Sequence, residues 1–130
     1  MKSVLISIKP KWCELIASGK KTIEIRKTKP RIDTPFKCYI YKTTTGKVIG
    51  EFVCDKMLLI VILAHSMVST LDRMRACLSA EEIIEYAAGN SYVYGWRISE
   101  LEIYDKPKEL SEFAIKRPPQ SWCYVEEVQE

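Results

Sequence analysis

The stretch GKKTIEIR, residues 19–26, joins a helical pattern to a strand pattern and places charged side chains at the joint. Its second half alternates apolar and charged residues, in the order Ile23, Glu24, Ile25, Arg26. A period of two is typical of a strand that buries one face, so the two charged side chains are expected together on the other face. The stretch therefore predicts a strand that displays charge.

The residues before this strand predict a short strand and then a helix. β-Branched residues favour a strand at residues 4–8, and Pro10 suits the first position of a helix. Apolar side chains at spacings i, i+3 and i+4 extend that helix over residues 10–18; they are Trp12, Leu15 and Ile16. Gly19 stands where a left-handed C-terminal cap is expected. The helix would thus lead directly into the charged strand, a rigid arrangement that suits a binding site.

Further strands are predicted after the junction. They lie at residues 22–28, 36–43, 48–54, 92–104 and 120–125. Alternation slips near Ser99 and Glu100, and residues 105–107 predict a turn. Residues 57–64 form the most apolar window and predict a buried strand, or two short ones, because eight residues cannot cross a bilayer that needs about 20.

Helical signals are fewer. Ser79 and Glu82 form a capping box, which predicts a helix over residues 79–88. Residues 65–78 carry a weaker helical pattern, and residues 110–115 a short amphipathic one. Short strands, two or three helices and Pro/Gly-rich connections favour a small α+β protein built on a curled sheet or barrel. A length of 130 residues with 47% apolar content fits one domain, residues 1–130.

The distribution of charge indicates the class of partner, and the cysteines indicate the redox compartment. Residues 1–50 hold 12 Lys and Arg against 3 acids, a net charge of +9, whereas residues 51–130 hold 8 against 14, a net charge of −6. A basic half indicates an anionic partner, nucleic acid first, although sequence halves need not be spatial halves. Five cysteines without a C-x-x-C pair fit neither a disulfide framework nor a zinc site. We expect reduced thiols in the cytoplasm, with no metal, cofactor or membrane partner.

Three side chains of the opening stretch suit a flat, anionic ligand: Lys21, Glu24 and Arg26. Glu24 and Arg26 lie close enough to pair, while the guanidinium would keep donors free for a phosphate or a base edge. A carboxylate accepts hydrogen bonds from an exocyclic amine, and Lys21 would neutralise a phosphate. The alternative is a surface Glu/Arg pair without function.

Gly19, Lys21, Glu24 and Arg26 spell G-x-K-x-x-E-x-R, which resembles the motif of the ASCH family within the PUA-like superfamily. Residues 9–30, 94–110 and 118–126 also resemble ASCH-domain proteins encoded in bacteriophages and prophages. The resemblance implies a PUA-like small mixed β-barrel with two or three flanking helices. It further implies that the protein binds RNA or a nucleotide in a cleft between the barrel and the first helix.

The resemblance also implies roles for individual residues. Gly19 would be structural, and the candidate ligand-binding residues are Lys9, Trp12, Lys21, Glu24, Arg26 and Trp96. Aromatic rings beside a basic cleft can stack on unpaired bases. For Trp12 and Trp96, core packing is the alternative interpretation.

A hydrolase acting on an acylated cytidine nucleoside or on RNA is the alternative function. Some compact relatives use the motif lysine and a threonine at the place of Glu24, so Lys21 and Glu24 would be the catalytic pair here. We expect Glu24 to hold Lys21 protonated, which would make it a poorer base. The single histidine, His65, follows an apolar run and is expected to be buried or incidental.

Overall fold

A computed structural model describes residues 2–62 and 70–126 of the chain. Its elements, in order, are β1 (Ser3–Ile8), α1 (Pro10–Ala17), β2 (Ile23–Arg26), β3 (Phe36–Lys42), β4 (Lys47–Val61), α2 (Thr70–Ala76), α3 (Ala80–Ala87), β5 (Tyr92–Lys108), the 3₁₀ helix η2 (Leu110–Phe113) and β6 (Trp122–Val125). His65 and the end of the apolar window at residues 63–64 lie outside the described residues.

The strands form one mixed, six-stranded sheet in the order β2-β5-β4-β3-β1-β6. β1 runs parallel to β3, and the other neighbouring pairs are antiparallel. The predicted barrel is wrong, because the sheet is not closed: β2 and β6 stand at its two edges, and no backbone pairing joins them. Each edge strand is only four residues long, which limits the ladder that could form between them.

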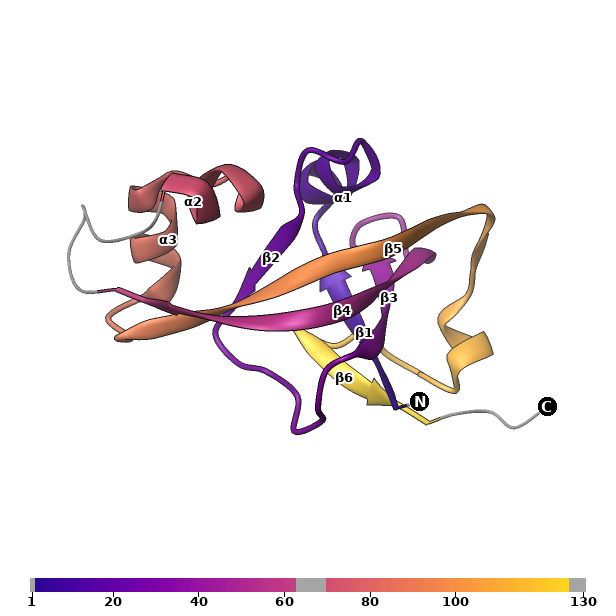
Figure 1. Cartoon of the computed structure of the whole chain (residues 1–130). Coiled ribbons are helices and arrows are strands. Elements are labelled where there is room, and N and C mark those ends of the chain that lie inside the picture. The colour runs from indigo at the N-terminus through magenta and orange to yellow at the C-terminus, as the bar shows by residue number, and fades with distance from the viewer. Residues whose placement is uncertain (1, 63–69, 127–130) are drawn as a thin grey trace.

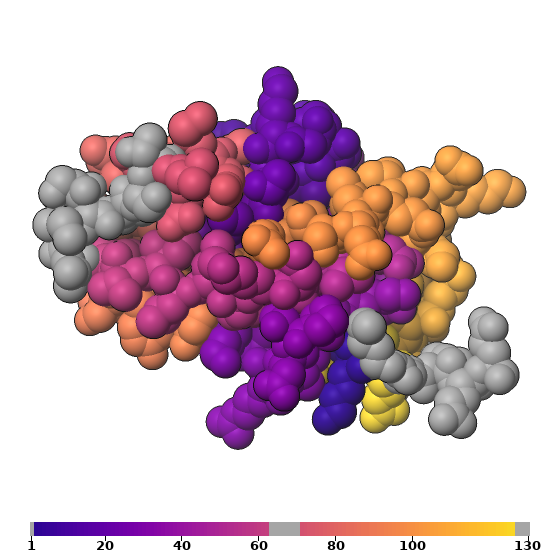
Figure 2. Space-filling model, viewed as in Figure 1, coloured from indigo at the N-terminus to yellow at the C-terminus, as the bar shows by residue number. Residues whose placement is uncertain are grey.

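A long antiparallel pair, β4 and β5, crosses the molecule (Figure 1). In Figure 2 its side chains run together over the visible face. The predicted slip near Ser99 and Glu100 is confirmed: the register shifts there, and Glu100 has φ 48°. The expected turn at residues 105–107 is wrong, because β5 continues through it. The apolar window does contain a strand as predicted, namely the end of β4, but it is only partly buried: Ile60 is buried, whereas Leu59 is exposed.

Gly50 permits the close approach of these two strands. A Cβ placed there would lie 2.4 Å from the backbone oxygen of Glu102, well inside van der Waals contact. The pairing register shifts next to Gly50 on both of its neighbours, β3 and β5. A bulge at Gly50 therefore lets β4 bend between its two partners.

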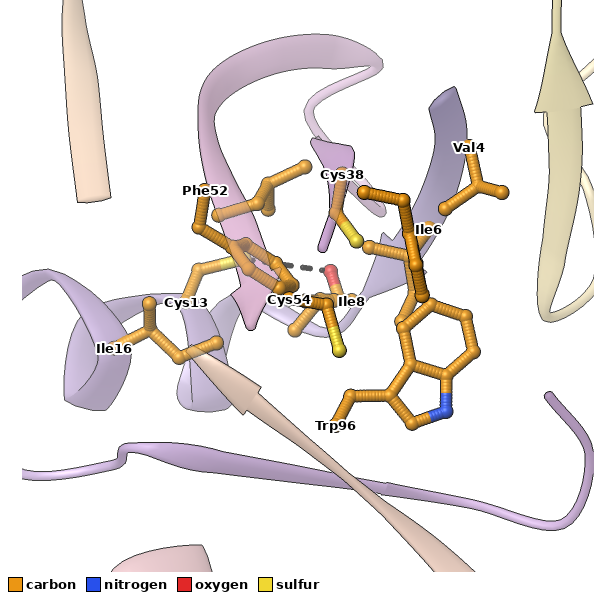
Figure 3. Close-up of a cluster of buried hydrophobic side chains, with 11 residues drawn as sticks. Val4, Ile6, Ile8, Cys13, Ile16, Cys38, Phe52, Cys54 and Trp96 are labelled. Atoms are coloured by element: carbon orange, nitrogen blue, oxygen red, sulfur yellow. Dashed lines mark hydrogen bonds between the residues drawn. The ribbon is translucent and has the colours of Figure 1, made fainter. Parts of the chain in front are cut away.

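The helices cover the sheet in two places (Figure 1). The buried residues of α1, Cys13 and Ile16, pack with side chains from β1, β3 and β4 and with the fully buried Trp96 (Figure 3). α2 and α3 cover the far end of the β4–β5 pair through a second cluster that includes Ile23, Ile60 and Ile83. The capping box predicted at Ser79 and Glu82 is present at the start of α3.

All five cysteines are free thiols within the described residues. Burial raises the pKa of Cys13 to about 11 and that of Cys54 to about 11. A thiol with a raised pKa forms little of the nucleophilic thiolate near neutral pH. These two cysteines therefore serve packing, as Figure 3 shows for both.

Candidate functional site

The junction between α1 and β2 is fixed by backbone hydrogen bonds. α1 ends at Ala17 and is capped by Ser18, whose N–H donates to the Glu14 carbonyl, and Gly19 follows with φ +82°. The Lys21 N–H then reaches back to the Leu15 carbonyl at 3.0 Å. This left-handed cap turns the chain sharply, so the Lys21 side chain starts from a fixed position.

The end of α2 docks against the same junction. The Lys21 ammonium donates to the carbonyl of Ala76, and the Thr22 N–H donates to the carbonyl of Arg75 at 2.7 Å. A helix C-terminus carries unpaired carbonyls and partial negative charge, which favour a cation there. Lys21 therefore caps α2 from a distant part of the chain.

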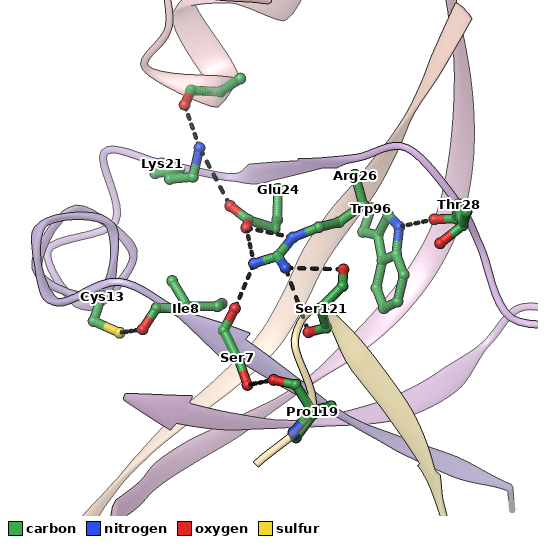
Figure 4. A network of polar contacts seen from close by, with 11 residues as sticks. Ser7, Ile8, Cys13, Lys21, Glu24, Arg26, Thr28, Trp96, Pro119 and Ser121 are labelled. Carbon is green, nitrogen blue, oxygen red and sulfur yellow. Dashed lines mark hydrogen bonds and ion pairs between the residues drawn. The ribbon is translucent and has the colours of Figure 1, made fainter. Parts of the chain in front are cut away.

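Glu24 and Arg26 form a largely buried ion pair on β2 (Figure 4). Arg26 Nε and Nη2 both donate to Glu24 Oε2, at 2.9 and 2.6 Å. Nη2 also donates to the Ser7 carbonyl of β1 at 2.7 Å. Nη1 donates to the hydroxyl and the carbonyl of Ser121, just before β6, at 3.2 and 3.4 Å. These five hydrogen bonds match the five N–H groups of a guanidinium. The prediction that Arg26 keeps donors free is therefore wrong.

Lys21 completes the group. Its Nζ lies 3.5 Å from Glu24 Oε1 and 4.8 Å from the centroid of the Trp12 ring. Lys21 is 2% exposed and Glu24 5%. Burial lowers the pKa of Lys21 below its ordinary value, and the opposing effect of the Glu24 carboxylate is smaller. We expected Glu24 to dominate and hold the lysine protonated; desolvation outweighs it because hardly any water reaches the ammonium.

A cavity of about 790 Å³ lies over this group. Its walls come from the start of α1, the segment after β2, the α3 helix and the segment before β6. Trp12 and Tyr86 contribute aromatic rings, and Lys27 stands 5.2 Å from the centroid of the Tyr86 ring. The carboxylates of Glu82 and Glu85 also line it. The cavity thus combines flat apolar surfaces with charges of both signs, in a volume typical of small-molecule sites.

The structure brings together five of the six candidate ligand-binding residues. The cavity is lined by Lys9, Trp12, Lys21, Glu24 and Arg26. Trp96 does not line it: the side chain is 0% exposed, packs edge-on against Phe36 and donates its Nε1–H to the Thr28 carbonyl. Sequence reasoning missed Tyr86, because its place on an exposed helix face becomes meaningful only once α3 lies beside β2.

Among the described residues, no group of three or more His, Cys, Asp or Glu side chains is placed to hold a metal ion. Over the same ranges, none of the helices combines the length and the apolar character needed to cross a membrane.

We expect Arg26→Lys to lower the free energy of unfolding by about 2–4 kcal/mol, because a lysine cannot reach Glu24, Ser7 and Ser121 together. Urea unfolding measures this. The matched control is Arg97→Lys, which breaks a two-point ion pair with Asp55 in a more exposed place and should change stability little. Equal losses in both variants would contradict the structural role of Arg26.

The lowered pKa of Lys21 predicts that the free energy of unfolding depends on pH. Since its folded-state pKa lies below the ordinary 10.5, the unfolded chain binds more protons between those two values, and stability rises with pH there. The free energy of unfolding, measured against that of Lys21→Met, should therefore increase as pH rises through the folded pKa toward 10.5. Urea unfolding of both proteins at several alkaline pH values measures the difference, and a difference independent of pH would show that the pKa is not lowered.

Comparisons with known proteins identify the family and a similar fold. The sequence matches the ASCH domain family over residues 6–111. The structure of ASCH from Zymomonas mobilis has a TM-score of 0.81 and 25% sequence identity, and the match covers 97% of this chain and 89% of that one. A single-site variant of the same protein gives 0.81 at 23% identity, covering 98% and 92%. No curated protein matches the chain. Because the family match extends over most of the sequence, this chain belongs to the ASCH domain family, whose fold is PUA-like and associated with RNA binding.

Proposed function

We propose that residues 1–130 act as one ASCH domain that binds single-stranded RNA or a nucleotide in the cavity beside the G-x-K-x-x-E-x-R motif. The observation that carries the proposal is the cavity itself, in which two aromatic side chains, Trp12 and Tyr86, and two exposed lysines, Lys9 and Lys27, surround the buried charged group. A base can stack on a ring face whatever its identity, and lysines neutralise phosphates.

The motif residues and the exposed lysines have different parts in this proposal. Lys21, Glu24 and Arg26 form the floor, already hydrogen-bonded to one another and to the backbone, so binding need not order them. Lys9 and Lys27 supply charge for phosphates at the rim. Glu82 and Glu85 offer acceptors for the exocyclic amines of bases. The free thiols support action in a reducing compartment such as the cytoplasm.

Lys9 and Lys27 provide the sharpest test, because removing motif residues would also disturb the fold. The double variant Lys9→Ala/Lys27→Ala should weaken binding of a short single-stranded RNA at least about tenfold and reduce the salt slope by about 0.7 for each phosphate that the protein no longer neutralises. Fluorescence anisotropy at several salt concentrations measures both. Lys106→Ala, on an exposed part of β5 outside the cavity, is the control. Unchanged RNA affinity in the double variant would overturn the proposal.

A hydrolase remains the second candidate, and one observation favours it. A buried lysine whose pKa is lowered, beside a carboxylate in a cavity, is a common arrangement for a general base. Incubation with N-acylated cytidines and RNA oligomers, followed by mass spectrometry, should then show product with the unmodified protein and none with Lys21→Met. Absence of product from the unmodified protein would exclude these substrates and leave the binding role.

A further inference from the structure

The segment after β2, residues 27–32, is held firmly although it belongs to neither a helix nor a strand. We name it the basic loop. Trp122 Nε1 donates to the Thr28 hydroxyl at 2.9 Å, and Trp96 Nε1 donates to the Thr28 carbonyl at 3.3 Å. Pro30 is buried, and Ile32 packs against the main core cluster. The loop therefore has an inner side anchored in the core and an outer side that it presents to solvent.

The outer side carries three cations at alternate positions, Lys27, Lys29 and Arg31, all exposed. Each lies beside a tyrosine from a different element. Lys27 Nζ is 5.2 Å from the ring centroid of Tyr86 on α3, and Lys29 Nζ is 5.8 Å from that of Tyr94 on β5.

The third pair, Arg31 and Tyr124, is joined by a hydrogen bond from the Arg31 backbone. The Arg31 N–H donates to the hydroxyl of Tyr124 on β6 at 2.8 Å, and Tyr124 is 51% exposed. Cations interleaved with aromatic rings are the pattern by which proteins follow a single strand of nucleic acid.

The two ends of the basic loop line two different hollows. Lys27 and Thr28 line the motif cavity. Arg31 and Ile32 line a second hollow of about 650 Å³, together with Lys2 and Tyr124. Lys27 and Arg31 are four residues apart, so at most about 14 Å of chain separates them. A ligand that extends beyond one nucleotide could therefore reach from one hollow to the other along the loop.

The chemistry of the second hollow fits a nucleotide. Among the described residues that line it, Lys2 and Arg31 provide two positive charges against one carboxylate, that of Glu126, and Tyr124 provides a ring. Trp122 packs edge-on against Tyr124 at 5.2 Å between ring centroids, which supports that ring from behind. A supported ring beside a cation offers stacking and phosphate neutralisation at the same place.

We propose that a single-stranded RNA runs along the basic loop from the motif cavity to the second hollow, where Arg31 and Tyr124 form a second nucleotide subsite. The preferred ligand is then an oligonucleotide and not a mononucleotide. This inference rests on the proposed function, since the motif cavity holds the first nucleotide.

Two probes separate the subsites: a fluorescein-labelled single-stranded RNA of about ten nucleotides, and cytidine monophosphate. Tyr124→Ala and Arg31→Glu should each weaken binding of the long RNA about tenfold and leave binding of cytidine monophosphate unchanged. Tyr124→Phe keeps the ring and should bind the long RNA almost as well as the unmodified protein. Lys106→Ala is the control for loss of positive charge, and circular dichroism verifies that each variant is folded.

The outcomes distinguish this inference from the proposed function. Unchanged affinity of Arg31→Glu for the long RNA overturns the second subsite, whatever the state of Tyr124→Ala, and leaves the motif cavity intact if cytidine monophosphate still binds. Equal weakening of both probes also overturns it, because the two residues would then act through the motif cavity. If the unmodified protein binds neither probe, the proposed function fails and the second subsite fails with it.

Discussion

The hydrogen bonds of Arg26 link parts of the structure that the backbone leaves apart. β2 and β6 lie at opposite edges of the sheet and share no backbone pairing. From β2, the Arg26 guanidinium reaches Ser7 on β1 and Ser121 before β6, while Glu24 neutralises its charge. A buried charge with even one donor unpaired would be costly, so its complete set of partners makes this location tolerable. One side chain thereby connects the two edges, and the cavity lined by the motif residues lies directly over that connection.

An arginine–carboxylate ion pair elsewhere in the molecule contributes less to stability. Arg97 donates to both carboxylate oxygens of Asp55, whereas Arg26 donates twice to one oxygen of Glu24. The side chains of Arg97 and Asp55 are 44% and 34% exposed, against 12% and 6% for Arg26 and Glu24. Water screens the exposed pair and competes for its hydrogen bonds, so it adds little to stability. Burial, rather than the identity of the residues, gives the motif pair its structural importance. It also leaves the motif with no free guanidinium donor, which moves the proposed phosphate contacts outward to lysines at the rim.

Local patterns in the sequence predicted local structure well. The cap at Gly19, the strand at Ile23 and Ile25, and the capping box at Ser79 depend on residues within a few positions of one another, and each appears where expected. The prediction that this strand displays its charged face was wrong, because Glu24 on that face is only 5% exposed. The predicted barrel was wrong because closure depends on whether two edge strands far apart in the sequence meet, and local sequence patterns do not determine this. The hydrogen-bond partners of Arg26 were not predicted for the same reason, since Ser121 lies 95 residues away. Trp96 was predicted correctly as a strand residue, but only the fold shows that its ring faces the core instead of the cavity.

The contact between Lys21 and the last turn of α2 has a consequence for how the site responds to a guest molecule. The ammonium that forms part of the cavity floor also occupies the carbonyl of Ala76. If a guest draws this ammonium away from Ala76, its binding weakens the attachment of α2, and detachment of α2 would change the affinity for that guest by the same factor, because a coupling free energy is reciprocal. Binding in the cavity and the position of that helix would then be thermodynamically linked.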